Sequence, residues 1–191
     1  MALGDSSLGA MSHRLSEEGE VVHMITNGGM FHPDLQPVGL YIEEGIEHTP
    51  LSLDDGSGNF YWKPNGIFMV DASGEPSIVV ADDWLNRKPT ATYATQSGPM
   101  LVIDGNLHAG VQKSTASEYI RNGVGILPSG HTLFGISKSP MNFHDFARAF
   151  QQAGCSNALY LDGAISRMHT DTASPPSRSG QFGVMIAAIN R

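Results

Sequence analysis

Turn residues divide the chain into short apolar runs. Its 191 residues include 22 glycines and 11 prolines, and many of these directly follow an apolar run. Because glycine readily adopts positive φ and proline interrupts helices and interior strands, this spacing favours short elements joined by tight turns. Apolar residues make up 40% of the chain and charged residues 16%, which suffices for a sizeable core. We therefore expect one globular domain over residues 1–191.

Most of the expected strands are apolar runs that end at turn residues. Three hairpins are predicted, because paired runs flank the turn segments 43–45, 71–76 and 128–130. Another turn is expected at Asp104-Gly105, and residues 172–180 are expected to form a loop. The strands are expected at residues 21–26, 38–42, 66–70, 77–80, 100–103, 122–127, 132–137, 158–161 and 182–189.

Two segments have the periodicity of amphipathic helices. Residues 7–18 place three apolar side chains on one face, after serines that can cap the first turn. Residues 143–153 are the clearer helix, since Asn142 can cap it and the phenylalanines at 143, 146 and 150 line one face. Two or three helices with seven to nine strands predict a mixed α/β (α+β) domain, in which an extensive mixed β-sheet is covered by a few helices.

The composition of the chain argues against nucleic-acid binding, an internal disulfide, a membrane span and a secretory signal. The net charge of −8, with only 11 lysines and arginines, argues against a nucleic-acid partner, because binding to the phosphate backbone needs a basic surface. Cys155 is the only cysteine, so no internal disulfide can form. No apolar run has the roughly 18–20 residues that span a membrane, and the N-terminus lacks the apolar region of a secretory signal.

The segment Asn27-Gly28-Gly29 directly follows an expected strand. Adjacent glycines can adopt positive φ and bring successive backbone N–H groups together, which would form an anion-binding concavity. The alternative is a tight turn, because Asn-Gly is above all a turn dipeptide.

Two further polar segments lie beside expected strands. In Gln96-Ser97-Gly98 the serine is outside the G-x-S-x-G pattern of a nucleophile, so we expect it to hydrogen-bond to a ligand. Arg121 and Asn122 lie at the start of another strand. In so acidic a chain the planar guanidinium is a reasonable phosphate ligand, although a surface arginine is the alternative.

Asp162 directly follows the apolar run that ends at Leu161. Ligand-binding groups of α/β proteins collect at the carboxyl ends of strands, and the following Gly163 would let a substrate approach closely. An Asp-Gly turn is the alternative. The eight histidines form no zinc motif, and residues 54–59 lack the ligand spacing of a calcium loop. We therefore expect no metal site and no other cofactor.

Several longer motifs follow one another along the chain, namely NGGMF, GNFYWKPNGIF, TQSGPMLVIDG, RNGVGI, FGIS, MNFHDFARAF and NALYLDGAISR. In sequence and in order they closely resemble the phosphodiester glycosidase family, which includes the catalytic domain of the mannose-6-phosphate uncovering enzyme. The resemblance implies hydrolysis of a sugar-1-phosphodiester, small or glycan-linked, to free sugar and a phosphomonoester.

The resemblance implies a set of site residues within those motifs. Many relatives carry two glycines where this chain has Ala164-Ile165, so a bulkier loop and a different substrate choice are expected. The chain is also expected to lack an N-terminal extension that relatives usually carry. The implied catalytic residues are Asp162, Arg121 and Asn27, and the implied substrate-binding residues are Gly28, Gly29, Asn65, Gln96, Ser97, Gly98, Asn122, Ser137, Gly163, Ser166 and Arg167.

The leaving group explains why one carboxylate would suffice. Ordinary glycosidases use two carboxyl groups, because an alkoxide leaving group needs a proton. A phosphomonoester has a second pKa of about 6 and departs without full protonation. We expect Arg121 and the Gly28-Gly29 amides to hold the phosphate, while Asp162 activates water or stabilises charge at the anomeric carbon. The alternatives are a metal-dependent phosphodiesterase and a non-catalytic carbohydrate- or phosphate-binding module.

Overall fold

The computed structural model describes residues 7–87, 89–111, 116–163, 165–170 and 180–190. Its helices are α1 (Leu8–Glu17), α2 (Ala81–Arg87) and α3 (Phe143–Gln152), with a short 3₁₀ helix η1 (Asn59–Tyr61). Its strands are β1 (Val21–Asn27), β2 (Tyr41–Glu43), β3 (Ile46–Thr49), β4 (Gly66–Asp71), β5 (Pro76–Val80), β6 (Ala91–Ser97), β7 (Met100–Ile103), β8 (Asn106–Leu107), β9 (Asn122–Ile126), β10 (Thr132–Ile136), β11 (Asn157–Tyr160), β12 (Met168–Thr170) and β13 (Met185–Asn190).

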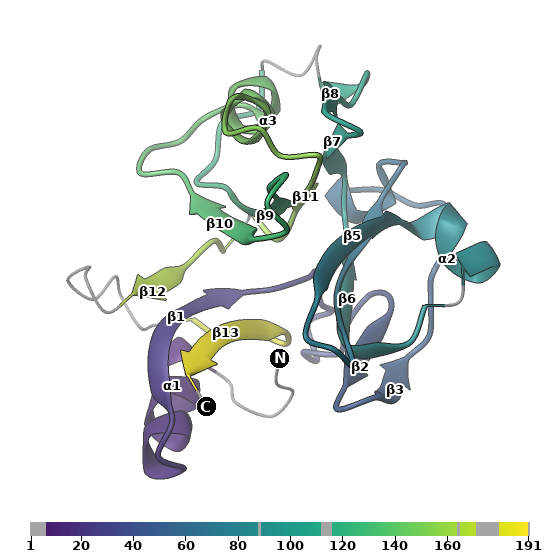
Figure 1. The fold of residues 1–191 in the computed structure, drawn as a ribbon. Coiled ribbons are helices and arrows are strands. Elements are labelled where there is room, and N and C mark those ends of the chain that lie inside the picture. Colours follow the sequence, from purple (N-terminus) through teal and green to yellow (C-terminus); the bar gives the residue numbers. More distant parts are fainter. Residues whose placement is uncertain (1–6, 88, 112–115, 164, 171–179, 191) are drawn as a thin grey trace.

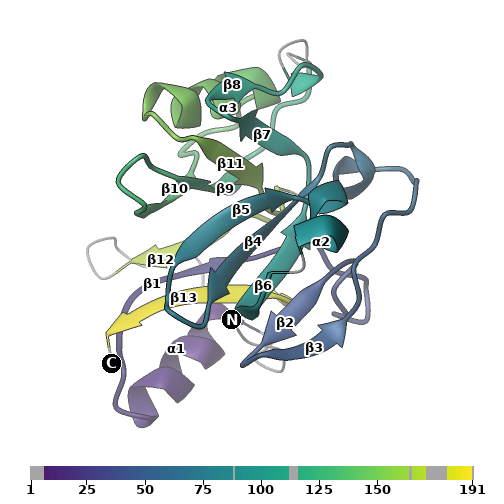
Figure 2. The same ribbon diagram turned by 45° about the vertical axis from the view of Figure 1, so that its right-hand side comes forward.

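The mixed α/β class is confirmed, and the strands are distributed over three sheets. The orders are β12-β1-β13, β10-β9-β11-β7-β8 and β3-β2-β6-β4-β5. Neighbouring strands of these sheets pair antiparallel, so three antiparallel sheets replace the single mixed sheet that we expected. In Figures 1 and 2, α3 lies against the sheet of β9 and β11, α2 beside β5, and α1 against β1 and β13.

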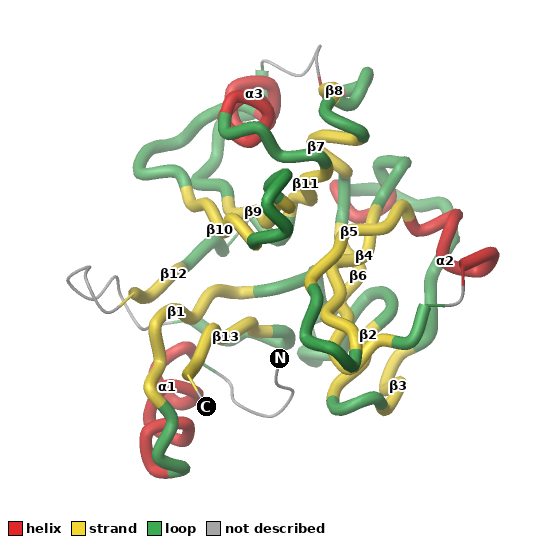
Figure 3. The backbone as a smooth tube through the Cα atoms, in the orientation of Figure 1, coloured by secondary structure: helices red, strands yellow, loops and turns green. Residues whose placement is uncertain are grey.

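One cluster of buried side chains joins the three sheets into a single domain. Figure 3 shows the strands at the centre of the molecule and the helices at its periphery. Burial of apolar surface common to all three sheets makes their association favourable. The cluster consists of Phe68, Ile78, Met100, Val124, Leu159, Leu161 and Ile186.

The structure confirms the turn expected at Asp104-Gly105 and the expected caps of two helices. The β7–β8 turn has φ of 48° at Asp104 and 76° at Gly105, as expected for a hairpin turn with two positive-φ residues. The Asn142 Oδ1 accepts a hydrogen bond from the backbone N–H of Asp145 at 2.8 Å and so caps α3. Ser7 caps α1 in the same way through the N–H of Ala10 at 3.1 Å.

Several elements differ from the sequence expectation. The last strand begins at Met185 rather than at residue 182. Residues 182–184 are apolar or glycine and are buried, which made them resemble a strand, but they belong to no strand. Sequence analysis did not predict α2, β6, β8 or β12. The strand β6 consists mostly of small and polar residues, so its central place in a sheet was not evident. Most of the loop expected at 172–180 lies outside the described residues.

Candidate active site

The ends of three strands meet where two of the sheets adjoin. Asn27 is the last residue of β1, Asn122 is the first residue of β9, and Asp162 lies two residues beyond the end of β11. Asn27 and Asn122 are fully buried, whereas Asp162 is partly exposed. The fold therefore brings together three predicted site residues that are far apart in the chain.

The side-chain amide of Asn122 connects these strand ends. Its Nδ2 donates to the backbone oxygen of Asn27 at 2.9 Å and to Asn27 Oδ1 at 3.1 Å. Its Oδ1 accepts from the backbone N–H of Asp162 and from the Ser166 hydroxyl, each at 3.1 Å. The Asn27 Nδ2 donates to the carbonyl oxygen of Asp162 at 3.1 Å. Because each buried group has several partners, the network fixes the turn that carries Asp162.

Ser166 and Arg167 lead the chain from this turn into β12. The backbone N–H of Arg167 donates to Asn27 Oδ1, and its Nη1 donates to the carbonyl oxygen of Ser166, both at 2.8 Å. The Ser166 hydroxyl also donates to the carbonyl oxygen of Asp162 at 3.0 Å. Arg167 is partly exposed, so one cation and one carboxylate flank the same turn at accessible positions.

Arg121 lies beside this network with its side chain fully buried. The guanidinium carbon lies 3.7 Å from the centre of the Phe143 ring. Its Nε donates to the carbonyl oxygen of Met141 at 2.7 Å, and its Nη2 donates to the carbonyl oxygen of Ser117 at 2.6 Å. Its Nη1 donates to the Tyr160 hydroxyl at 3.2 Å. All of these acceptors are neutral.

The charge of Arg121 has no acidic partner in the described part of the chain. Arg121 takes part in none of the salt bridges of those residues, which include Lys63 with Asp55 and Arg87 with Asp83. Burial lowers the pKa of Arg121, but an arginine stays protonated in proteins. A buried cation without a counter-charge costs free energy, and an anionic ligand would recover part of that cost.

Tyr160 is a site residue that the sequence analysis missed. Its hydroxyl accepts from Arg121 Nη1 and lies against the backbone of Gly163, where a Cβ would overlap it. Burial raises the pKa of this phenol to about 12, while the Arg121 charge lowers it and the Asp162 charge raises it. One signal was available, namely a tyrosine inside the apolar run that precedes Asp162, because buried tyrosine hydroxyls usually have a partner.

Ser137 and Ser97 support the site through the backbone. Ser137 Oγ accepts from the N–H of Arg121 at 2.9 Å, and the N–H of Ser137 donates to the carbonyl oxygen of Arg121 at 2.8 Å. The Ser97 hydroxyl is fully buried and donates to the carbonyl oxygen of Leu161 at 2.9 Å. Because this proton is already donated within the fold, the Ser97 hydroxyl retains only its capacity to accept, and its contact with a ligand stays a prediction.

The anion-binding concavity expected at Gly28 and Gly29 does not form. Neither residue has positive φ, and the N–H of Gly28 donates to the carbonyl oxygen of Val184 at 2.8 Å. Both glycines are instead required by close packing. A Cβ on Gly28 would lie 2.8 Å from Val184 Cγ1, and one on Gly29 would overlap Thr95 Oγ1.

Three other expected binding residues, Gln96, Asn65 and Gly98, have close partners within the fold. Gln96 is buried, its Oε1 accepts from the N–H of Leu40 at 2.9 Å, and its Nε2 donates to the carbonyl oxygen of Ser52 at 2.6 Å. Asn65 is also buried and donates to a backbone carbonyl 3.1 Å away. A Cβ on Gly98 would lie 2.8 Å from the Cβ of Asn65. The Gln96 and Asn65 amides therefore hold loops in place, and Gly98 is required by close packing, while contact of these residues with a ligand stays a prediction.

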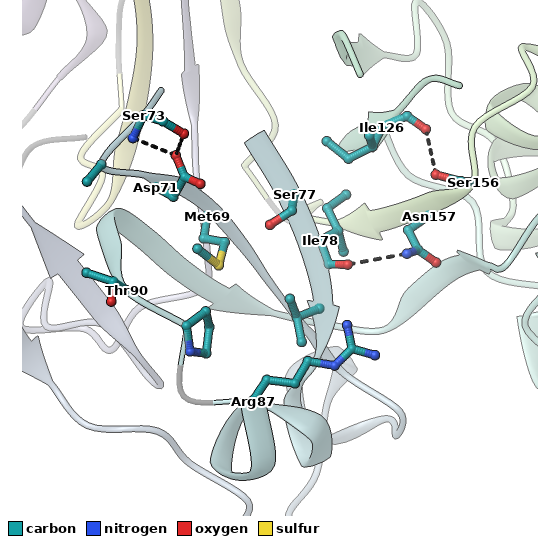
Figure 4. A pocket seen from close by; sticks show the side chains of 13 residues that line it. Met69, Asp71, Ser73, Ser77, Ile78, Arg87, Thr90, Ile126, Ser156 and Asn157 are labelled. Carbon is teal, nitrogen blue, oxygen red and sulfur yellow. Dashed lines mark hydrogen bonds between the residues drawn. The ribbon is translucent and has the colours of Figure 1, made fainter. Parts of the chain in front are cut away.

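Two surface cavities lie away from the predicted site. One, of about 750 Å³, is lined by the β4–β5 hairpin and by Asn157 of β11. Figure 4 shows its hydrogen bonds, including that from Asn157 to the carbonyl oxygen of Ile78. The other, of about 930 Å³, lies between α1, β13 and β4. None of the predicted site residues lines either cavity.

Neither a cluster of metal ligands nor a membrane-spanning helix occurs among the described residues. No three His, Cys, Asp or Glu side chains among them lie close enough together to share a metal ion. No helix in that part of the chain has both the length and the apolar character needed to cross a membrane.

A family model described as phosphodiester glycosidase matches residues 20–184. The chain is also 36% identical over 182 residues to the uncharacterized protein YigE of Escherichia coli strain K12. That similarity covers 95% of this chain and 70% of the Escherichia coli protein.

Two solved structures have a similar fold. One is the catalytic domain of zebrafish N-acetylglucosamine-1-phosphodiester alpha-N-acetylglucosaminidase, auto-inhibited by its pro-peptide, with a TM-score of 0.63 and 19% identity. The match covers 91% of this chain and 65% of the zebrafish chain. The other is a hypothetical protein from Synechocystis, with a TM-score of 0.63 and 12% identity, matching 99% of this chain and 54% of its own. At these identities the likeness concerns the fold alone.

Proposed function

The chain belongs to the phosphodiester glycosidase family, and on that premise we propose that it hydrolyses sugar-1-phosphodiesters. The bond that breaks joins the anomeric carbon to the phosphate oxygen. The products are the free sugar and a phosphomonoester of the second alcohol. The substrate is a small molecule or a glycan that carries this linkage.

The observation that carries the proposal is the placement of Arg121 and Asp162 around Tyr160. Arg121 donates to the Tyr160 hydroxyl, and the same hydroxyl lies in close contact with Gly163, the residue after Asp162. A buried cation without an acidic partner among the described residues therefore adjoins a partly exposed carboxylate. Binding of a phosphate and activation of water at a sugar carbon need these two charges.

A phosphate oxygen would replace Ser117 at the Arg121 guanidinium. Ser117 is exposed, and its carbonyl and hydroxyl oxygens lie 2.6 Å and 3.4 Å from Arg121 Nη2. Phosphate brings a full negative charge to the guanidinium, whereas the Ser117 oxygens are neutral, so the substrate phosphate is the stronger partner for this atom. Arg167 provides a second cation at the other side of the Asp162 turn.

The chemistry needs one carboxylate. Water attacks the anomeric carbon, its oxygen forms the new bond, and Asp162 accepts the proton that water loses. The electron pair of the breaking bond passes to the phosphate oxygen, whose negative charge Arg121 stabilises. Because the phosphomonoester has a second pKa of about 6, no second carboxyl group is required to protonate it.

The test is hydrolysis of a panel of sugar-1-phosphodiesters in water enriched in heavy oxygen. The panel includes N-acetylglucosamine-1-phosphodiesters, because the zebrafish relative is named for that linkage. We expect the label on the anomeric hydroxyl and none on phosphate, with the same rate in the presence of a chelator. Label on the phosphate, together with loss of hydrolysis when chelator is present, would identify a metal-dependent phosphodiesterase. Binding of every substrate without turnover would identify a binding module.

A further inference from the structure

We propose that Tyr160 is a positioning residue, whose hydroxyl holds the Arg121 guanidinium against the Asp162-Gly163 turn. The inference rests on the proposed function, in which Arg121 binds the phosphate and Asp162 acts at the sugar. Tyr160 acts through Arg121 and does not contact the reacting atoms.

The hydroxyl oxygen of Tyr160 is shared by the two sides of the site. Arg121 Nη1 donates to it at 3.2 Å, and the backbone of Gly163 lies directly against it. The approach of Gly163 is so close that a Cβ at this position would overlap the hydroxyl. Glycine is therefore required after Asp162 because Tyr160 occupies the space that a side chain would need.

The aromatic ring of Tyr160 is held in a fixed position. The side chain is 1% exposed, and the Phe143 and Phe146 rings lie 4.7 Å and 6.4 Å from its centre in edge contacts. The face of Phe143 also supports the Arg121 guanidinium, at 3.7 Å. Since one ring orients both the phenol and the cation, the distance between them has little freedom to vary.

A tyrosine positions the guanidinium without neutralising it. With a pKa of about 12, the phenol is uncharged at neutral pH. A carboxylate in its place would pair with Arg121 and compete with phosphate. The neutral hydroxyl accepts one guanidinium N–H and leaves the positive charge for an anionic ligand.

The test uses Tyr160→Phe, which keeps the ring and removes only the hydroxyl. The full chain is titrated with inorganic phosphate in a calorimeter. We expect the Kd for phosphate to rise about 3- to 10-fold, the range that loss of one hydrogen bond implies. Tyr93→Phe, in β6 and outside this network, is the matched control and should leave the Kd unchanged. A Kd for Tyr160→Phe equal to that of the wild-type protein would overturn the positioning role.

A double-mutant cycle with Arg121→Ala separates positioning from a general effect on the fold. If Tyr160 acts through Arg121, Tyr160→Phe should change the Kd less than about twofold once Arg121 is alanine. An equal loss in both backgrounds would assign Tyr160 a structural role only and overturn the proposal.

The same cycle distinguishes failure of this inference from failure of the proposed function. If Arg121→Ala weakens phosphate binding and Tyr160→Phe does not, the positioning role fails and the phosphate assignment survives. If the wild-type protein does not bind phosphate, or Arg121→Ala leaves the Kd unchanged, the assignment of phosphate to Arg121 fails and the role of Tyr160 fails with it.

Discussion

The side-chain Nδ2 of Asn122 donates to two oxygens of Asn27, a residue that lies 95 positions earlier in the chain. Both side chains are fully buried. The Asn122 Oδ1 accepts from the N–H of Asp162 at the same time. One side chain therefore links the sheet of β1 to the sheet of β9 and β11, and fixes the turn that carries the candidate catalytic carboxylate.

Asn122→Ala should destabilise the protein. The substitution leaves buried groups of Asn27 and Asp162 with fewer partners, and a buried polar group left unsatisfied costs about 1–3 kcal/mol. We expect urea unfolding to report a loss of at least this size. Asn106→Ala, at an exposed position of β8, is the control and should stay within about 0.5 kcal/mol of wild type. Equal unfolding midpoints for Asn122→Ala and wild type would mean that the network is dispensable.

Phe146→Ala should lower the free energy of unfolding much more than His144→Ala, although both residues lie in α3. Phe146 is 4% exposed and packs edge-on against Phe150, with ring centres 5.3 Å apart. Removal of such a ring from a core costs about 3–5 kcal/mol. His144→Ala, at a partly exposed position of the same helix, should cost much less. The measurement is the thermal unfolding midpoint of the wild-type protein and of the two variants. A midpoint of Phe146→Ala equal to that of the wild type would show that the Phe146 ring is not packed in the core.

Arg121→Ala should act on the phosphate end of the substrate. A hydrogen bond to a charged group contributes about 1.5–3 kcal/mol, so kcat/KM on a phosphodiester should fall roughly 10- to 150-fold. An activated aryl glycoside of the same sugar carries no phosphate, and its turnover should fall much less. Because Arg121 is buried, circular dichroism must first establish that the variant is folded. Equal losses on both substrates in a folded variant would contradict the phosphate assignment.

Asp162→Asn should act on the sugar end and damage both substrates alike. The substitution keeps the size of the side chain and the backbone bond to Asn122, but removes the base that accepts a proton from water. We expect a loss of about 100-fold or more in kcat on either substrate, in the range found for general bases. Steady-state kinetics at saturating substrate measure it. Full activity of this variant would show that Asp162 has no catalytic role and only forms part of the turn.

Much of the local structure could be predicted because its cause is local. Positive φ at Asp104 and Gly105 follows from the preferences of those residue types, and Asn142 caps α3 with a bond to a residue three positions away. The strand β6 could not be predicted in this way. Its place between β2 and β4 depends on pairing with segments elsewhere in the chain, and pairing of that kind leaves little trace in the residues of the strand itself.

The same division applies to the candidate site. Polar residues at the strand ends can be recognised from the sequence alone, and Asn27, Asn122 and Asp162 do come together. The sequence gives no indication that the side-chain oxygen of Gln96 accepts from the backbone of Leu40, 56 positions away, or that Tyr160 contacts Arg121, because both contacts arise only in the folded chain. The reason is physical: a polar side chain has the same bonding capacity in a core as at a binding site, and the partners that satisfy it come from distant segments.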